Sequence, residues 1–509
     1  MLVSKQGLAV AAMALCLGHP ALAEVSPEQV WQELEAYVTD MGYDLRASQS
    51  RAGGALRLSD VAIHMPFPEG DGEMTAQIGE MLLTPDGGAV KVALPARFPI
   101  TLTATPKPEE DIEAVDMTIE VSLDAPEMTV SGDPGDTTWD YAFQRIGMAL
   151  SELIVDDATV GRDAARAQAS AGPVSGTSRM ALADGLRKID QQVSFGDLTW
   201  DLLGNDPDSA NGGTLAGALT GLRSQTRASL PQGDAQNMSA LLGDGFDVAA
   251  TLNWDSSQTA FAVTETGSET TGSTRSGVGA VEVAMGPQGL RYDLQSADMS
   301  IELSPPGMPF PLSAAMQSFE MKLEGPVGPA EAPQDIAIGL TLGELTLSEM
   351  IWAMIDPQAV LPRDPATLAL DITGKVTPYM EMFDPAKLAE LDSGNVKPGE
   401  LNALTLNGLT LEAAGARLSG TGAFTFDNND LESFDGFPAP EGTLVLALSG
   451  ANGLLDKLMA LGLVDETQAM GTRMMLGMFA VPGNAEDSLT STIEINGRGQ
   501  ILANGQRIK

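Results

Sequence analysis

Residues 117–123, Met-Thr-Ile-Glu-Val-Ser-Leu, alternate apolar and polar side chains without a break. The same period of two recurs in Ala89 to Leu94 and Thr101 to Thr105, and Pro, Gly and Asp occupy the breaks between such runs. Strict alternation is typical of a strand with one buried face, and Pro, Gly and Asp favour the turns that join antiparallel strands. We therefore predict an α+β, mainly β fold with long antiparallel twisted sheets and a few short helices.

The composition limits the class of partner. The chain has 509 residues, of which 43% are hydrophobic, and 69 Asp plus Glu against 28 Lys plus Arg give a formal charge of −41. This length leaves room for about two to four domains with sizeable cores. So much negative charge repels phosphate backbones and anionic lipid headgroups, because both bind through Lys and Arg. Nucleic acid is thereby excluded as a partner.

The first 23 residues have the form of an export signal. Lys5 gives a weakly basic start, Leu8 to Gly18 form an apolar core, and Ala21 and Ala23 supply the small residues that signal peptidase recognises. We predict cleavage between Ala23 and Glu24 and a periplasmic location.

Cys16 is the only cysteine and would leave with this signal. Leu15 stands where a lipoprotein signal needs a small residue, so lipidation is the less favoured interpretation. The mature chain would then form no disulfide and no thiolate metal site. We also expect no transmembrane segment after the signal, because the most apolar later stretch, Leu444 to Val464, is interrupted by polar and charged residues.

One clear helix precedes the strands. Ser26-Pro27-Glu28-Gln29 is a capping box with proline at the first helical position, and apolar side chains at helical spacing follow it up to Gly42. Trp139 to Val155 fits either a helix or strands, since Trp139, Tyr141 and Phe143 also alternate. Its neighbours favour strands there.

Changes of composition suggest the organisation of the chain. Gly161 to Ser178 and Gly204 to Gly213 are poor in large apolar residues and are predicted as linkers or exposed loops. Thr264 to Gly279, rich in Gly, Ser and Thr, is predicted as a flexible hairpin loop. The predicted regions are a signal peptide (1–23), an N-terminal helix with a β-sheet region (24–160), a linker or loop-rich region (161–213) and a C-terminal β-rich region with short helices (214–509).

The C-terminal region shows a recurring order of strand, short helix and strand. Short helices are predicted near Asn237 to Leu242, between Ser348 and Asp356, and from Asn452 to Leu461. This order is compatible with a degenerate repeat of sheet modules.

The chain offers little catalytic machinery. His64 is the only histidine beyond the signal, and its setting in Val61 to Met65 favours a strand histidine that faces solvent or a neighbouring hydroxyl. The usual hydrolase, protease, phosphate-loop and dinucleotide motifs are missing. A glycan hydrolase that uses two carboxylates is the remaining enzymatic alternative, although aromatic residues make up only 5% of the chain. We expect no catalytic residue and no cofactor.

Calcium is the cation best suited to so many carboxylates. Asp206, Asp208 and Asn211 resemble the start of a calcium loop, but Gly217 stands where the bidentate glutamate belongs. A solvated turn is the favoured interpretation, and we predict no metal site.

A methionine-bearing apolar segment lies near the C-terminus. Methionine adapts to irregular partners, so such a surface could hold acyl chains; the alternative is a helix pair that covers one end or face of the sheet. The residues proposed for an apolar ligand surface are Leu454, Leu458, Met459, Met474, Met475, Met478 and Phe479.

Residues 404–411, the glycine-rich run at 414–422 and the ending at 497–505 resemble the exported alphaproteobacterial domain of unknown function 2125 family. The resemblance covers almost the whole mature chain and carries no catalytic residue with it. The strand pattern is similar in style to AsmA-like envelope proteins, which implies a curved sheet with an apolar groove. We expect the mature chain to depart from that group in having no N-terminal membrane anchor.

These observations predict a non-enzymatic periplasmic protein that binds a lipid or another apolar ligand in a β-sheet groove. The alternative is a structural or protein-interaction component of the cell envelope. The glycan hydrolase is the third hypothesis.

Overall fold

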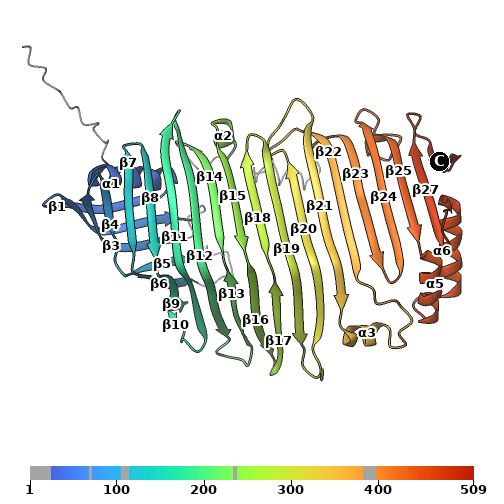
Figure 1. Ribbon diagram of the computed structural model, residues 1–509, viewed down its shortest axis with the longest axis horizontal. Helices are drawn as coiled ribbons and strands as arrows, with labels where there is room; N and C mark the ends of the chain where they lie inside the picture. The colour runs from blue at the N-terminus through green and yellow to red at the C-terminus, as the bar shows by residue number, and fades with distance from the viewer. Residues whose placement is uncertain (1–24, 68–71, 105–113, 233–237, 382–396) are drawn as a thin grey trace, which may run out of the picture.

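The computed structural model describes the chain except for residues 1–24, 68–71, 105–113, 233–237 and 382–396. The predicted signal peptide and its cleavage site between Ala23 and Glu24 lie outside the described residues. Within them, 29 strands form one hydrogen-bonded antiparallel sheet, and five short helices accompany it. The strands run across the long axis of an elongated body (Figure 1). The predicted mainly β, α+β fold is confirmed.

Helix α1 (Pro27–Asp40) begins at the predicted capping box. The Ser26 hydroxyl accepts a hydrogen bond from the Gln29 amide, and the Gln29 side chain accepts one from the Ser26 amide. Val30, Trp31 and Val38 are buried against the first strands.

The N-terminal part holds the buried core. Both clusters of buried apolar side chains found among the described residues lie here, around Leu58, Leu83 and Val90 and around Val121 and Val174. Trp139 to Val155 forms strands, as predicted. The strands are β1 (Asp44–Ala52), β2 (Ala55–Pro66), β3 (Gly72–Asp86), β4 (Ala89–Ala93), β5 (Arg97–Ala104), β6 (Val115–Asp124), β7 (Glu127–Asp133), β8 (Asp136–Phe143), β9 (Arg145–Val155) and β10 (Ala158–Thr159).

The prediction of a linker or loop-rich region at 161–213 is wrong for most of its length. Strands β11 (Ala165–Ala183) and β12 (Leu186–Asn205) are the longest in the described chain and pair along almost their whole length. The small residues that suggested a linker make room for large neighbours. A Cβ added to Gly176 would lie 2.6 Å from the ring of Tyr141, its cross-strand partner. Only residues 206–211 form a loop in the predicted Gly204 to Gly213 stretch.

The flexible loop predicted for Thr264 to Gly279 is also wrong. Thr266 and Gly267 form a two-residue turn, both with positive φ, and a strand follows directly. A two-residue turn in which both residues have positive φ has a backbone twist that matches the twist of the paired strands, so a tight hairpin forms. The central strands are β13 (Gly212–Thr220), β14 (Arg223–Pro231), β15 (Asp247–Trp254), β16 (Ser256–Glu265), β17 (Ser268–Ser276), β18 (Gly279–Gly286), β19 (Gly289–Ser304), β20 (Leu312–Gly325) and β21 (Gln334–Leu347).

The last third of the chain is a meander that ends in a helical hairpin. Its strands are β22 (Ala366–Pro378), β23 (Gly399–Ala413), β24 (Ala416–Asp427), β25 (Ala439–Ser449), β26 (Val481–Pro482), β27 (Ser488–Ile495), β28 (Ile501–Ala503) and β29 (Gln506–Arg507). The helices are α2 (Met238–Gly243), α3 (Glu349–Ile355), α5 (Ala451–Ala460) and α6 (Glu466–Phe479).

The three short helices predicted in the C-terminal region are therefore present. They do not occupy equivalent places, because α2 lies at the upper end of the strands in Figure 1 whereas α3 and α5 lie toward the lower end. This arrangement gives the predicted repeat no support. None of the helices in the described chain is long and apolar enough to cross a membrane.

Candidate functional site

One side of the sheet between β15 and β27 carries rows of apolar side chains. Ile338 of β21 lies between Leu323 of β20 and Ile372 of β22, which in turn lies beside Leu406 of β23. Cross-strand partners share a face of a sheet, so these pairs define a continuous surface. We call it the apolar face: Leu252, Trp254, Val281, Val283, Leu290, Tyr292, Leu294, Phe319, Met321, Leu323, Ile336, Ile338, Leu340, Leu342, Leu368, Leu370, Ile372, Leu404, Leu406, Leu409, Leu411, Leu418, Phe424, Leu444, Leu446, Leu448, Leu489 and Ile493.

The alternate residues make the opposite face polar. Thr373, next to Ile372, is exposed on that side and pairs with Ala337. A bulge at Asn407 and Gly408 of β23 shifts the alternation by one residue, so leucines stay on the apolar face at both ends of the strand. This part of the sheet is therefore amphipathic.

The apolar face is only partly buried. Leu323, Ile338 and Leu411 are 46%, 44% and 48% exposed, and neither buried cluster of the described residues extends to this face. Monomeric soluble proteins rarely expose contiguous apolar areas of more than a few hundred Å², and larger ones mark ligand or partner sites. Ten strands about 4.8 Å apart make this surface about 45 Å long.

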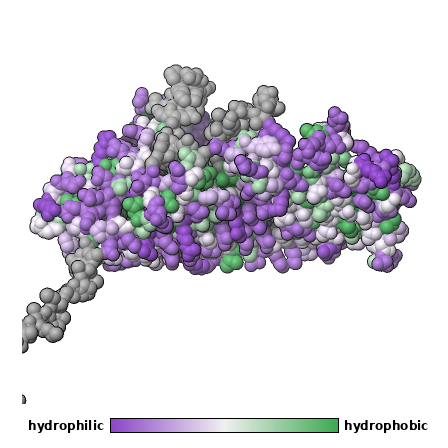
Figure 2. Space-filling view, turned by 90° about the horizontal axis from the view of Figure 1, so that it is seen from above, coloured by the Kyte–Doolittle hydropathy of each residue, from purple (hydrophilic) through white to green (hydrophobic). Residues whose placement is uncertain are grey.

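A groove deepens the apolar face at the upper end of β19 to β23. Its volume is about 560 Å³, within the range of ligand pockets. The loop after β20 forms one wall, and the Ala330 amide ties this loop to the Pro378 carbonyl at 3.0 Å. Figure 2 looks onto this end of the strands and shows a hydrophobic patch near the middle of a mainly hydrophilic surface. The main apolar lining residues are Leu290, Leu323, Val327, Ile336, Ile338, Val376 and Leu401.

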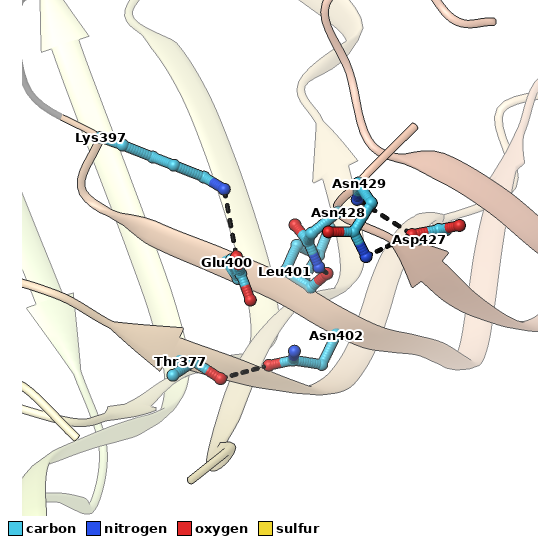
Figure 3. A network of polar contacts seen from close by, with 8 residues as sticks. All are labelled: Thr377, Lys397, Glu400, Leu401, Asn402, Asp427, Asn428 and Asn429. Atoms are coloured by element: carbon cyan, nitrogen blue, oxygen red, sulfur yellow. Dashed lines mark hydrogen bonds and ion pairs between the residues drawn. The ribbon is translucent and has the colours of Figure 1, made fainter. Parts of the chain in front are cut away.

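A charged cluster lies beside the groove, where the chain enters β23. Lys397 Nζ is 3.3 Å from Glu400 Oε1 and 5.8 Å from the ring centre of Tyr379 (Figure 3 draws the Lys397 and Glu400 pair). Hydrogen bonds from the Tyr379 hydroxyl and the Lys397 ammonium lower the pKa of Glu400 below its usual value. The same Glu400 carboxylate raises the pKa of Tyr379. Glu400 therefore stays charged at neutral pH.

Polar contacts fix the strand ends around this cluster. The Thr377 hydroxyl donates to Asn402 Oδ1 at 2.9 Å, and Asn428 Nδ2 donates to the Leu401 carbonyl at 2.7 Å (Figure 3). These bonds join β22, β23 and the turn after β24, so the groove is held by interactions outside its apolar lining.

The C-terminal residues predicted as a ligand surface lie elsewhere. They form the hairpin of α5 and α6 beside β27, on the far side of β24 and β25 from the groove (Figure 1). Leu454, Leu458 and Met459 on α5 are half-buried. On α6 the exposed fractions are 71% for Met474, 58% for Met475, 60% for Met478 and 37% for Phe479. The structure therefore does not bring this surface together with the groove.

Two other predictions concerned single polar residues. His64 Nδ1 is hydrogen-bonded to the Thr75 hydroxyl at 3.0 Å, which confirms the strand histidine beside a hydroxyl. Asp206 accepts the Asp208 amide at 2.9 Å and the Ser209 hydroxyl at 2.6 Å, the pattern of a solvated turn. No group of three potential metal ligands occurs among the residues that the structure describes.

The part of the chain that contains the groove matches a known protein family. The family described as an uncharacterized protein conserved in bacteria (DUF2125) matches residues 245–502, half of the chain. The chain belongs to the DUF2125 family. In this DUF2125 protein the matched residues run from the start of β15 into β28 and so include the apolar face, the groove and the α5 and α6 hairpin. No curated protein matches the chain.

The groove residues were not predicted from the sequence. Alternating leucines and isoleucines at 336–342, 368–372 and 404–411 were the available signal, since strands with one apolar face must bury it somewhere. Tyr379, Lys397 and Glu400 carry no such signal, because their proximity depends on how two strand ends meet.

Proposed function

We propose that this DUF2125 protein is a periplasmic, non-enzymatic protein that binds the acyl chains of a lipid along the apolar face. The observation that carries the proposal is the partial exposure of that face across ten strands, with a groove of about 560 Å³ at one end. The export signal predicted for residues 1–23 supports the location.

The size of the face is sufficient for useful affinity. Each buried methylene contributes about 0.8 kcal/mol, so a chain with about ten buried methylenes gains about 8 kcal/mol. This corresponds to a dissociation constant of about 1 μM before the costs of ordering the ligand. The groove alone accommodates part of one acyl chain. The rows of apolar side chains beyond the groove offer further contact to the rest of it.

A matched pair of substitutions tests the proposal. Ile338→Glu places a charge in the groove at a position that is already 44% exposed, so the fold tolerates it. Thr373→Glu makes an acidic change at an exposed position on the opposite face of β22. We expect Ile338→Glu to weaken the binding of a fluorescent fatty acid at least tenfold and Thr373→Glu to leave it unchanged. Equal binding by both variants would contradict the proposal.

The second candidate is an interaction component of the envelope. The exposed methionines of α6 favour it, because methionine side chains adapt to varied partner surfaces. The charge of −41 and the carboxylates of Asp465 and Glu466 beside this helix favour a partner with basic residues around an apolar patch. Photocrosslinking from position 474 in intact cells tests this role: one reproducible protein adduct supports it, and no adduct contradicts it.

A further inference from the structure

An uncharged turn joins β19 to β20 at the lower end of the strands in Figure 1. This turn is residues 305–311, Pro-Pro-Gly-Met-Pro-Phe-Pro, and no charged residue occurs between Glu302 and Glu320. Met308 and Phe310 are its large apolar side chains, and both are open to solvent, Phe310 with 61% of its surface. The turn therefore presents apolar surface without charge.

Helix α3 adds a second uncharged segment at the same end of the strands. The Ser348 amide donates to the Ser313 carbonyl at 2.8 Å, and the Ser313 amide donates to Ser348 Oγ at 3.2 Å, so the start of α3 is fixed beside the start of β20. Residues 350–355 carry no charge, and Met354 and Ile355 are exposed. We call the exposed apolar residues of the two segments the apolar tip: Met308, Phe310, Met354 and Ile355.

The backbone of the turn suits an apolar medium. Four of its seven residues are proline, which has no N–H donor, and the Met308 amide donates to the Pro305 carbonyl at 3.4 Å. An amide that loses water without gaining a partner costs free energy, and a bilayer core offers no water in exchange. A turn with few amide donors therefore enters lipid at a smaller cost than an ordinary loop.

The charges near the apolar tip restrict the surface that it can approach. Strand β17 pairs with β19 as far as Ser304, so the turn between β16 and β17 is a neighbour of the tip, and Glu265 and Glu269 lie on the two sides of that turn. Glu349 at the start of α3 is paired with Arg363. These neighbours and the formal charge of −41 repel anionic lipid headgroups but not zwitterionic ones.

The opposite end of the strands carries an exposed phenylalanine in a different setting. Phe437 is 75% exposed in the loop between β24 and β25, and Asp430, Glu432 and Asp435 stand in the same loop. The apolar tip differs in combining exposure with an absence of charge and with few amide donors. This combination matches the hydrocarbon edge of a bilayer better than a protein surface, whose hydrogen-bonding groups and charges the tip would leave without partners.

We infer that the apolar tip docks this protein on the surface of a bilayer of zwitterionic lipids. The inference goes beyond the proposed function, because it concerns contact with an intact bilayer and uses no residue of the apolar face or of the groove.

Flotation of the mature protein with phosphatidylcholine vesicles tests the inference. Phe310→Glu and Phe437→Glu make the same change at opposite ends of the strands, and both side chains are largely exposed, so the fold tolerates each variant. We expect Phe310→Glu to lower binding to the vesicles at least about tenfold, because it removes an apolar side chain from the bilayer and places a charge there. Phe437→Glu should bind as the unmodified protein does.

The composition of the vesicles tests the charge argument. Replacement of about a third of the phosphatidylcholine by phosphatidylglycerol should weaken binding several-fold at low salt, and 1 M salt should remove most of this difference, because the Debye length falls to about 3 Å. Stronger binding to the vesicles with the anionic lipid would overturn the preference for zwitterionic lipids.

The outcomes keep this inference apart from the proposed function. Failure of the unmodified protein to float with the vesicles, or equal binding by Phe310→Glu and Phe437→Glu, overturns the inference. Sedimentation velocity identifies a competing occupant: a dimer that only Phe310→Glu dissociates would assign the tip to a second copy of the chain and overturn the inference as well. Phe310→Glu should still bind the fluorescent fatty acid, and Ile338→Glu should still float with the vesicles, so either claim can fail without the other.

Discussion

The indole ring of Trp254 on β15 lies directly over the backbone of Gly279, its cross-strand partner on β18. A Cβ added to Gly279 would overlap the ring. The same relationship joins Phe261 with Gly272 and Tyr141 with Gly176. An aromatic ring that covers a glycine fills the space left by the missing side chain and fixes the register of the two strands.

We expect Gly279→Ala to destabilise the protein by about 1 to 3 kcal/mol, because overpacking forces the ring or the strand to move. Gly204→Ala is the control, since nothing lies within 4 Å of a Cβ built there. It should be neutral or stabilising by up to about 1 kcal/mol, because alanine restricts the unfolded chain. Chemical denaturation measures both, and equal destabilisation would contradict the packing argument.

Glu33 fixes helix α1 on the sheet. Its carboxylate accepts the Gly135 amide at 2.7 Å and the hydroxyl of the buried Thr137 at 2.8 Å. Glu33→Ala should cost about 1 to 3 kcal/mol of stability, because it leaves two polar groups without their acceptor. Glu35→Ala, on the exposed side of the same helix, should change stability by less than about 0.5 kcal/mol. A similar loss in both variants would contradict the role assigned to the hydrogen bonds of Glu33.

Asp487 gives the helical hairpin a dependence on pH. Burial raises the pKa of this carboxyl, but hydrogen bonds from the Gly453 amide and from Asn452 outweigh it and leave the pKa lowered in the fold. A lowered folded pKa contributes stability above the unfolded value of about 3.9, and this contribution is lost as the pH falls through the folded pKa. We therefore expect Asp487→Asn to reduce the loss of stability on acidification below about pH 4.

Thermal unfolding between pH 7 and pH 3 checks this dependence. Asp184→Asn serves as the control, because the Asp184 side chain is 87% exposed. An acid transition that is the same in Asp487→Asn and the unmodified protein would contradict the assignment.

A substitution at Met474 tests whether the helical hairpin contributes to stability or to ligand binding. Its side chain is 71% exposed on α6, so Met474→Glu should change stability by less than about 0.5 kcal/mol. Binding of the fluorescent fatty acid should also be unchanged, because the methionines of α6 lie apart from the groove. Weakened fatty acid binding in this variant would show that the helical hairpin belongs to the ligand surface after all.

Local patterns predicted the elements better than they predicted the site. The capping box at Ser26 and the alternation at 117–123 depend on neighbouring residues, so the helix and the strand follow from the sequence. The stretches at 161–178 and 264–279 are predicted as a linker or loops because small residues dominate them, yet most of each stretch forms strands. Their role depends on an aromatic ring from another strand, which no local pattern shows.

The site depends on longer-range geometry. Met474 and its neighbours stood out as an apolar segment, but an apolar helix face does not reveal where the groove lies. The groove arises where the loop after β20 approaches the ends of β21 to β23, and Tyr379, Lys397 and Glu400 meet only there. The composition gives the negative net charge of the protein, and this charge disfavours anionic ligands.

The most direct test of the account is native mass spectrometry, with lipid extraction, of the mature protein purified from the periplasm of its own host. The account predicts a discrete added mass that resolves to a lipid in the unmodified protein and in Thr373→Glu, and its loss in Ile338→Glu. A mass without any adduct in the unmodified protein, or an adduct that survives Ile338→Glu unchanged, would contradict binding along the apolar face.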